Sequence, residues 1–424
     1  MKESQGFKVG SASPKVSFNW LSDSVILTFA NLLAAAANYL FQALMRRHLS
    51  WSEFGYLNAS LSLILFASVP LTAASQTLTH HLALLSSRGD TPKMVLIQAA
   101  SLKVLRHFTW LLILLSLIFI YPVSDFLHYP RSSLVWTVLL LIPVNLWSAL
   151  GGAWCSGLSR FRLLAFLMIS AAVVRLSTGE IFVRLWPWAE TGLFATMLSG
   201  LVLATVVIIS PHHAASASVR SFLRDRKLMI YGLAALSVSF GTLAFLQGDQ
   251  IIAQRHFSGE TLGRYSGAGL LGRAIVWVGL PVLTVYFTRR SGRHPNHRSP
   301  VILIWVYLGL IIIGSLFLIM FRIQLLSLLL GVHDSELATM ASQFALVMIP
   351  IGILQALGFH FLAARQILAC LLFGTLGILY LIALTWWGTT PSLILETMGI
   401  TAALATLLLG FLSWLQQSTL PPSA

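Results

Sequence analysis

"RRHLSWSEFGYLNAS", residues 46–60, and "QRHFSGETLGRYSGA", residues 254–268, are two versions of one turn. With Arg47 placed on Arg255, the two stretches share Arg, His, Ser and Gly in one register, 208 positions apart. "IPVNLWSALG" (142–151) aligns in the same way with "IPIGILQALG" (349–358), 207 positions apart. Two nearly equal offsets, each close to half of the 424 residues, predict a two-fold internal repeat.

The composition indicates a membrane protein. Hydrophobic residues make up 57% of the chain and charged residues 9%, with a mean hydropathy of +0.83. About twelve apolar runs are long enough to cross the hydrocarbon core of a bilayer. Backbone groups in lipid must be bonded within the segment, so we expect helices. The predicted spans are 22–45, 54–79, 97–121, 134–156, 162–185, 190–210, 229–254, 261–287, 301–321, 337–361, 366–387 and 392–414.

The predicted fold is therefore an all-α polytopic membrane protein with two six-helix bundles. Its expected parts are a tail (1–18), the first bundle (19–211), a basic linker (212–228), the second bundle (229–415) and a second tail (416–424). Six spans per half give the two halves the same orientation, so the repeats should be parallel. We expect four prolines to kink their helices and to free backbone carbonyls toward a cavity. They are Pro70, Pro143, Pro281 and Pro350.

The basic residues predict the orientation of the chain. With both termini in the cytoplasm, 18 of the 27 Lys and Arg residues lie inside, seven lie outside and two lie within spans. The seven outside are Arg46, Arg47, Arg131, Arg184, Arg255, Arg264 and Arg322. The net charge of +14 then indicates topology and attraction to anionic membrane lipids rather than nucleic-acid binding. We expect a multi-pass protein of the cytoplasmic membrane.

Motifs for catalysis, cofactors or metals are absent from the sequence. Cys155 and Cys370 lie near predicted cytoplasmic helix ends, where a disulfide is not expected. The histidine pairs lack the Cys or carboxylate partners of a metal site. The hydrophilic segments are far shorter than a catalytic domain. These patterns favour a transporter over an enzyme.

Four ionisable residues inside spans are the main candidates for function. Arg175 and Arg273 approach the midplane, one from each half, and an arginine fork suits the oxygens of a pyrophosphate. The alternative is that both are structural cations. Asp249 is either a partner of Arg273 or a gating or proton site. Glu180 is a gating or ion-coupling candidate, although its spacing to Arg184 favours a local ion pair.

The first span carries a polar stripe. Ser24, Asn31, Asn38 and Gln42 fall within a narrow arc of one helix face. In lipid this face must meet protein or water. The stripe either lines a sugar-binding cavity or bonds a neighbouring helix.

The run "QGDQIIAQRHFSGETLGRYSGAGLLGRAIVWVGLPVLTVYF" (247–287) resembles the seventh and eighth helices of polysaccharide biosynthesis proteins of the oligosaccharide flippase type. These proteins belong to the multidrug/oligosaccharidyl-lipid/polysaccharide exporter superfamily. The positions of the family pattern are Asp249, Phe257, Gly263, Tyr265, Gly272, Arg273 and Pro281. Residues 38–63 and 157–165 are similar as well.

This resemblance implies a MATE-like transporter fold, with two bundles around a central cavity that works by alternating access. The implied cargo is a lipid-linked oligosaccharide, moved from the cytoplasmic to the outer leaflet of a bacterial inner membrane. O-antigen or exopolysaccharide synthesis would use such a step, and polysaccharide-assembly enzymes are possible partners. No cofactor is implied.

Other functions remain open for the same fold. The cargo of a multidrug exporter is an organic cation, which requires carboxylates within the first half, where only Glu180 and Asp23 are candidates. The deep residues are cationic instead, which favours anionic cargo. A flippase for peptidoglycan precursors fits this charge equally. A membrane scaffold without transport would need neither deep arginines nor a polar stripe.

Overall fold

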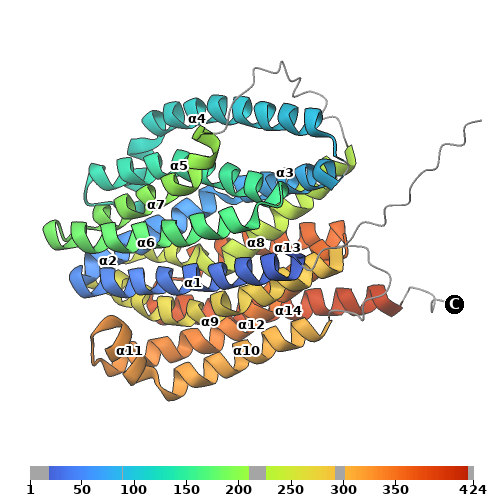
Figure 1. Ribbon diagram of the computed structural model, residues 1–424. Coiled ribbons are helices and arrows are strands. Elements are labelled where there is room, and N and C mark those ends of the chain that lie inside the picture. The colour runs from blue at the N-terminus through green and yellow to red at the C-terminus, as the bar shows by residue number, and fades with distance from the viewer. Residues whose placement is uncertain (1–18, 88, 210–225, 292–300, 419–424) are drawn as a thin grey trace, which may run out of the picture.

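The computed structural model describes residues 19–87, 89–209, 226–291 and 301–418, and these ranges contain helices joined by short turns (Figure 1). The first-half helices are α1 (Asn19–His48), α2 (Trp51–Ala67), α3 (Val69–Ser87), α4 (Thr91–Leu127), α5 (Ser132–Gly157), α6 (Phe161–Leu185) and α7 (Ala189–Ile209). The second-half helices are α8 (Arg226–His256), α9 (Gly259–Ser291), α10 (Val301–Met320), α11 (Arg322–Leu330), α12 (Ser335–Ala363), α13 (Ile367–Trp387) and α14 (Pro391–Ser418). The predicted all-α polytopic class is confirmed.

Within the described ranges, ten helices are long and apolar enough to cross a membrane, or up to eleven if α2 and α3 form one bent span. The thirty-residue α1, which carries the predicted polar stripe, is not among them. The predicted span 54–79 is broken at Ser68, with a bend of 46° between α2 and α3. Pro70 causes this break because it lacks an N–H to continue the helix, and it lies in the first turn of α3. Pro143, Pro281 and Pro350 lie inside continuous helices.

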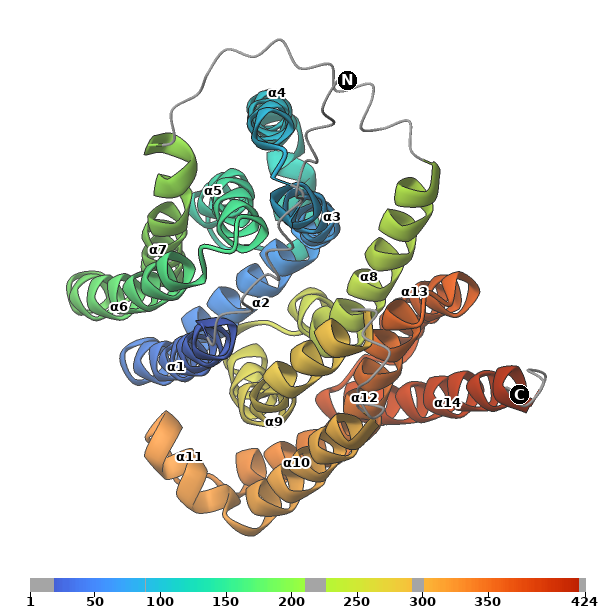
Figure 2. The same cartoon turned by 45° about the vertical axis from the view of Figure 1, so that its right-hand side comes forward.

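The two halves pack their helices in the same order. In the first half α1 packs on α6, and α5 packs on α3, α4 and α7. In the second half α8 packs on α13, and α12 packs on α9, α10 and α14. The bent pair α2–α3 thus corresponds to α9. Figure 2 shows the helices of the first half beside those of the second half. This shared packing order confirms the predicted repeat.

The repeated turn lies where the halves meet. Helix α2 packs against α9, and α8 packs against α2 and α3. A Cβ atom on Gly55 would lie 2.9 Å from the backbone nitrogen of Gly263, and one on Gly263 would lie 1.9 Å from the carbonyl oxygen of Trp51. The matching glycines of the two sequence repeats therefore permit the close approach of α2 and α9.

The turns alternate between two ends of the molecule. We call them the Glu53 end and the linker end. The Glu53 end contains helix α11 and the turns after α1, α4, α6, α8 and α13. The linker end contains the turns after α3, α5 and α12. The predicted tails, the basic stretch 289–298 beyond Ser291 and most of the linker 212–228 lie outside the described residues. Helix α8 begins at Arg226, and the predicted division into bundles, linker and tails stays a prediction.

Candidate functional site

The predicted candidates fall into two separate groups, and the first surrounds Arg273 inside the second bundle. Arg273 is 5% exposed, and its Nη2 forms an ion pair with the carboxylate of Asp249, which is 0% exposed. The Nε of Arg273 donates to the carbonyl oxygen of Leu246 at 2.9 Å, and Tyr265 Oη donates to Asp249 Oδ2 at 2.6 Å. The ion pair expected as one alternative for Asp249 is therefore present.

In this conformation Arg273 is buried and paired with a carboxylate, and its predicted role in binding a pyrophosphate stays a prediction. A buried guanidinium without a counter-charge is strongly disfavoured, and Asp249 supplies that charge from α8. Gln250 joins the cluster, since its Nε2 donates to Ser266 Oγ at 2.5 Å and its Oε1 lies 3.5 Å from Arg273 Nη1. Two buried oxygens in the described part lack a hydrogen-bond partner here, Asp249 Oδ1 and Tyr380 Oη.

The second group lies in the first bundle, between α1 and α6. Arg175 Nη1 donates to Asn38 Oδ1 at 2.7 Å, and Arg175 Cζ lies 4.2 Å from the ring centroid of Phe41. Among the described residues Arg175 forms no ion pair, and its Nε is a buried donor without an acceptor. Arg175 thus differs from Arg273 in keeping a positive charge without a carboxylate beside it.

The remaining candidates have local contacts. Asn31 Nδ2 donates to the carbonyl oxygen of Leu27 at 2.9 Å on its own helix, and Gln42 Oε1 is buried without a partner in the described part. Of the stripe side chains that the structure describes, Asn31, Asn38 and Gln42, only Asn38 is seen to bond a neighbouring helix. Glu180 forms the ion pair with Arg184 that the spacing predicted, and it also lies 3.5 Å from His48 Nε2.

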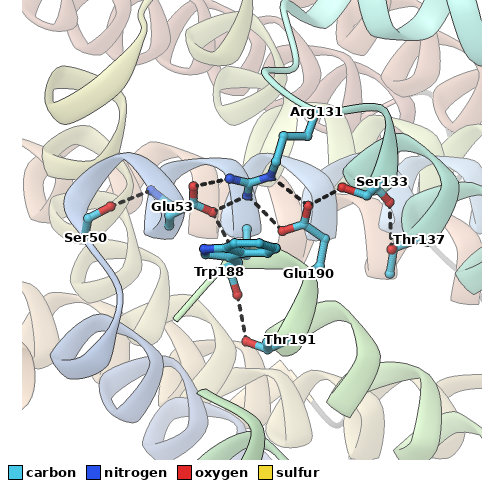
Figure 3. A network of polar contacts seen from close by, with 9 residues as sticks. Ser50, Glu53, Arg131, Ser133, Thr137, Trp188, Glu190 and Thr191 are labelled. Carbon is cyan, nitrogen blue, oxygen red and sulfur yellow. Dashed lines mark hydrogen bonds and ion pairs between the residues drawn. The ribbon is translucent and has the colours of Figure 1, made fainter. Parts of the chain in front are cut away.

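A third charged group was not predicted, and Figure 3 shows it at the Glu53 end of the first bundle. Arg131 binds the carboxylate of Glu53 through Nη1 and Nη2, at 2.9 and 2.7 Å. It also binds the carboxylate of Glu190 through Nε and Nη2, at 2.9 and 2.8 Å. We call these residues, with Ser133 and Trp188, the Arg131 cluster.

The Arg131 cluster joins three elements. Glu53 lies in the first turn of α2, Arg131 is the N-cap residue of α5, and Glu190 lies in the first turn of α7. Ser133 Oγ donates to Glu190 Oε1 at 2.7 Å, and the indole of Trp188 lies 5.1 Å from the guanidinium carbon. The hydrogen bonds to Glu53 and then to Glu190 raise the pKa of Arg131 above its ordinary value. In the sequence analysis Arg131 served only to predict the orientation of the chain. Glu53, Arg131 and Glu190 nevertheless all border predicted spans on the same side of the membrane.

The second bundle contains a counterpart with the charges exchanged. Arg264 on α9 contacts Asp334 through Nη2, Glu336 through Nη1 at 3.2 Å and Glu260 through Nε at 3.1 Å. Asp334 is the N-cap residue of α12, the counterpart of α5. We call this group the Arg264 cluster. The second span of each half is thus tied to the N-cap of the fourth span, with the arginine at the cap in one half and on the second span in the other.

Solved structures with a similar arrangement of helices include multidrug transporters and a lipid flippase. An inward-facing multidrug resistance MATE family transporter of the MOP superfamily matches with a TM-score of 0.66 and 11% identity, covering 94% of this chain and 100% of that one. The lipid II flippase MurJ, in an inward closed conformation, matches with a TM-score of 0.67 and 12% identity, over 93% and 87%. The chain has the fold of these transporters.

A MATE transporter from Vibrio cholerae matches with a TM-score of 0.60 and 15% identity, over 94% of this chain and 97% of that one. No protein-family model matches the chain, and no curated protein matches it in sequence. The MATE-like fold implied by the resemblance is therefore confirmed, whereas the oligosaccharide flippase family itself stays a prediction.

Proposed function

We propose that the protein is a membrane transporter that flips a lipid-linked oligosaccharide from the cytoplasmic to the outer leaflet by alternating access. The pyrophosphate of such a cargo carries negative charge, its sugars are polar, and its polyprenyl tail stays in the bilayer. The proposal rests on the surroundings of Arg175. This arginine lies inside a predicted span, and its described contacts are an amide and an aromatic ring. A ligand phosphate would complete this set of contacts.

The balance of charges within the spans supports anionic cargo. Asp249 is neutralised by Arg273, and Glu180 is neutralised by Arg184. Arg175 then remains as the charge near the predicted midplane that has no carboxylate partner among the described residues. In this proposal Arg175, Asn38 and Gln42 contact the head of the cargo, with Asn31 further along the same face.

Arg273 with Asp249, Gln250 and Tyr265, which we call the Arg273 cluster, has a different role in this proposal. Asp249 Oδ1 has no partner among the described residues, and opening of the second bundle would expose it together with Arg273. We therefore assign Asp249 and Arg273 to gating or ion coupling. This buried carboxylate is also the observation that favours the alternative, export of an organic cation by the same fold.

A flipping assay tests the cargo. Vesicles containing the purified protein and a polyprenyl-pyrophosphate disaccharide with a reducible fluorophore on its sugar report flipping as loss of protection from an impermeant reductant. We expect Arg175→Ala to lose about ten- to a hundred-fold in apparent affinity, since a charge-assisted contact contributes roughly 1.5–3 kcal/mol. Arg175→Lys should recover only part of this loss, because it keeps the charge without the fork.

Arg184→Ala is the matched control, because Arg184 is an exposed arginine on the same helix. Undiminished flipping by Arg175→Ala, with folded protein in the membrane, would contradict the role of Arg175. Efflux of a fluorescent cation that depends on Asp249, without flipping of the lipid, would establish the alternative.

The proposal also fixes the orientation and the setting. The linker end faces the cytoplasm of a bacterium, and both termini lie on that side. In a variant without Cys155 and Cys370, an impermeant thiol reagent added to intact cells should label Thr389→Cys at the Glu53 end but not Ser159→Cys at the linker end. The reverse pattern would invert the direction of transport. Enzymes of polysaccharide assembly are the proposed partners.

A further inference from the structure

Helix α4 differs from its neighbours in length and exposure. Its 37 residues extend about 55 Å, whereas the hydrocarbon core of a bilayer takes up about 20 residues of helix. Only 11% of its most apolar window is buried, against 50% for α5, which it packs against. Figure 1 shows α4 at the edge of the bundle. One side of α4 therefore faces lipid, and its first turns extend beyond the hydrocarbon at the linker end.

The exposed side of α4 changes character along its length. From Trp110, which is 71% exposed, to Tyr121, which is 82% exposed, the outward residues are apolar or aromatic. Just before this region lie Lys103, Arg106 and His107, all exposed and spaced to share one helix face. In the described part neither Lys103 nor Arg106 forms an ion pair. An interfacial tryptophan beside basic residues is typical of the boundary between headgroups and acyl chains.

A groove lies at this boundary. It has a volume of about 320 Å³ and is lined by Lys103, Val104, His107, Phe108 and Leu111. His107 Nδ1 lies 2.8 Å from the carbonyl oxygen of Lys103, so the ring donates from Nδ1, and in the imidazolium form its Nε2–H also donates to a phosphate. The surface of the groove is thus apolar, and the basic groups of this helix face lie at its edge.

We propose that this groove binds one anionic phospholipid of the leaflet at the linker end. The phosphate contacts Lys103, Arg106 and His107, and the first part of an acyl chain lies along Val104, Phe108 and Leu111. A soluble anion would gain nothing from the apolar groove, and a neutral lipid would gain nothing from the basic groups at its edge. With the predicted orientation this leaflet is the cytoplasmic one, where anionic lipids are attracted by basic residues.

Native mass spectrometry of the intact protein tests the site. The protein is released from nanodiscs of phosphatidylcholine with a minor share of phosphatidylglycerol, and the retained lipids are counted. We expect the wild type to retain one phosphatidylglycerol. We expect the double variant Lys103→Ala/Arg106→Ala to lose its preference for phosphatidylglycerol by about 5-fold for each removed charge. Phe108→Ala should weaken retention of both lipids, because it shortens the apolar groove.

Lys93→Ala is the control, since Lys93 is exposed on the same helix, outside the groove, and pairs with Asp90 at 2.7 Å. Retention by the double variant equal to the wild type would overturn the proposal, as would an equal loss in Lys93→Ala. Displacement of the retained lipid by millimolar inorganic phosphate would indicate a soluble-anion site instead. Displacement by polyprenyl phosphate at concentrations where added phosphatidylglycerol has no effect would assign the groove to the transported lipid. Thermal unfolding of each variant verifies that the exposed substitutions leave the fold intact.

Discussion

In each half, one arginine links helices of that half at the Glu53 end. Arg131 takes part in four hydrogen bonds to two carboxylates that come from α2 and α7, and Arg264 contacts three carboxylates around α9 and α12. Because the arginine and the carboxylate exchange places between the halves, a second span placed beside the wrong N-cap would meet a like charge. Arg131 would then face Arg264, and Glu53 would face Asp334. The exchange therefore favours the correct pairing within each half.

At this scale we predict that Arg131→Ala destabilises the protein by about 2–3 kcal/mol. This is less than the 3–5 kcal/mol typical of a fully buried pair, because the Arg131 side chain is 30% exposed. Two carboxylates would remain side by side without their shared counter-charge. Arg131→Lys should recover part of the loss, since one ammonium cannot bind both carboxylates in a fork. Thermal unfolding in detergent measures this, and an unchanged midpoint for Arg131→Ala would show that the cluster contributes little.

The Arg273 cluster gives a second prediction at the residue scale. Arg273→Ala leaves the carboxylate of Asp249 buried without a counter-charge, which costs roughly 3–5 kcal/mol. We expect little folded protein from this variant. The double variant Arg273→Gln/Asp249→Asn removes both charges and should restore the yield. Size-exclusion profiles of the three proteins decide the matter, and a normal yield of active Arg273→Ala would mean that the ion pair is dispensable.

At the scale of elements, glycines set how closely the helices approach. A Cβ atom on Gly151 would lie 2.2 Å from the carbonyl oxygen of Leu203, so α5 and α7 pack backbone to backbone at this point. The neighbouring Gly152 has open space around its Cβ position. Gly151 belongs to the repeated "ALG" of residues 149–151 and 356–358, so this part of the repeat also serves packing.

We predict opposite effects for these two neighbours. Gly151→Ala should destabilise the first bundle by about 1–3 kcal/mol, because a backbone carbonyl cannot move aside as a side chain can. Gly152→Ala should be neutral or stabilising by up to about 1 kcal/mol, the helix preference of Ala over Gly. Unfolding midpoints of the two variants test the pair. Equal midpoints would contradict the close contact between α5 and α7.

At the scale of the whole molecule, the halves are joined at the Glu53 end. The close contact of α2 with α9 lies there, and Arg47 Nη2 donates to the carbonyl oxygen of Leu328 at 2.6 Å, which links α1 to α11. A positive group near the carboxyl end of a short helix is favourable. The proposed alternating access would require these contacts to break when the Glu53 end opens. The molecule is therefore in a state that is closed at that end.

We predict that Gly263→Ala shifts the molecule away from this state. The new methyl group would lie 1.9 Å from the carbonyl oxygen of Trp51, so α2 and α9 must separate. Spin labels on α1 and α11 at the Glu53 end should report longer distances in this variant than in the wild type. Gly309→Ala is the control, because its Cβ position is open. Unchanged distances in a folded Gly263→Ala protein would refute the contact as a gate.

The sequence by itself determined the membrane-spanning class, the helical composition, the repeat and the charged candidates deep within the spans, but not the charged clusters at the Glu53 end. The length of an apolar run predicts a span in lipid, and internal similarity predicts that the two halves are equivalent. Both can be read from the order of residues along the chain, without knowing which residues meet in space. The pairing of Glu180 with Arg184 was also predictable, since residues four apart on a helix are always neighbours.

Only the tertiary structure decided which charges meet across elements. Asp249 and Arg273 lie 24 positions apart, and Glu53 and Arg131 lie 78 apart, so their contacts depend on how helices rotate and pack. Because of this packing, Arg175 has no carboxylate beside it, whereas Arg273 is paired with Asp249. From the sequence the two arginines had been given the same predicted role. The bend at Ser68 agrees with the kink predicted from Pro70. The short helix α11 was missed, because hydropathy alone gives no signal for a nine-residue helix at the end of a span.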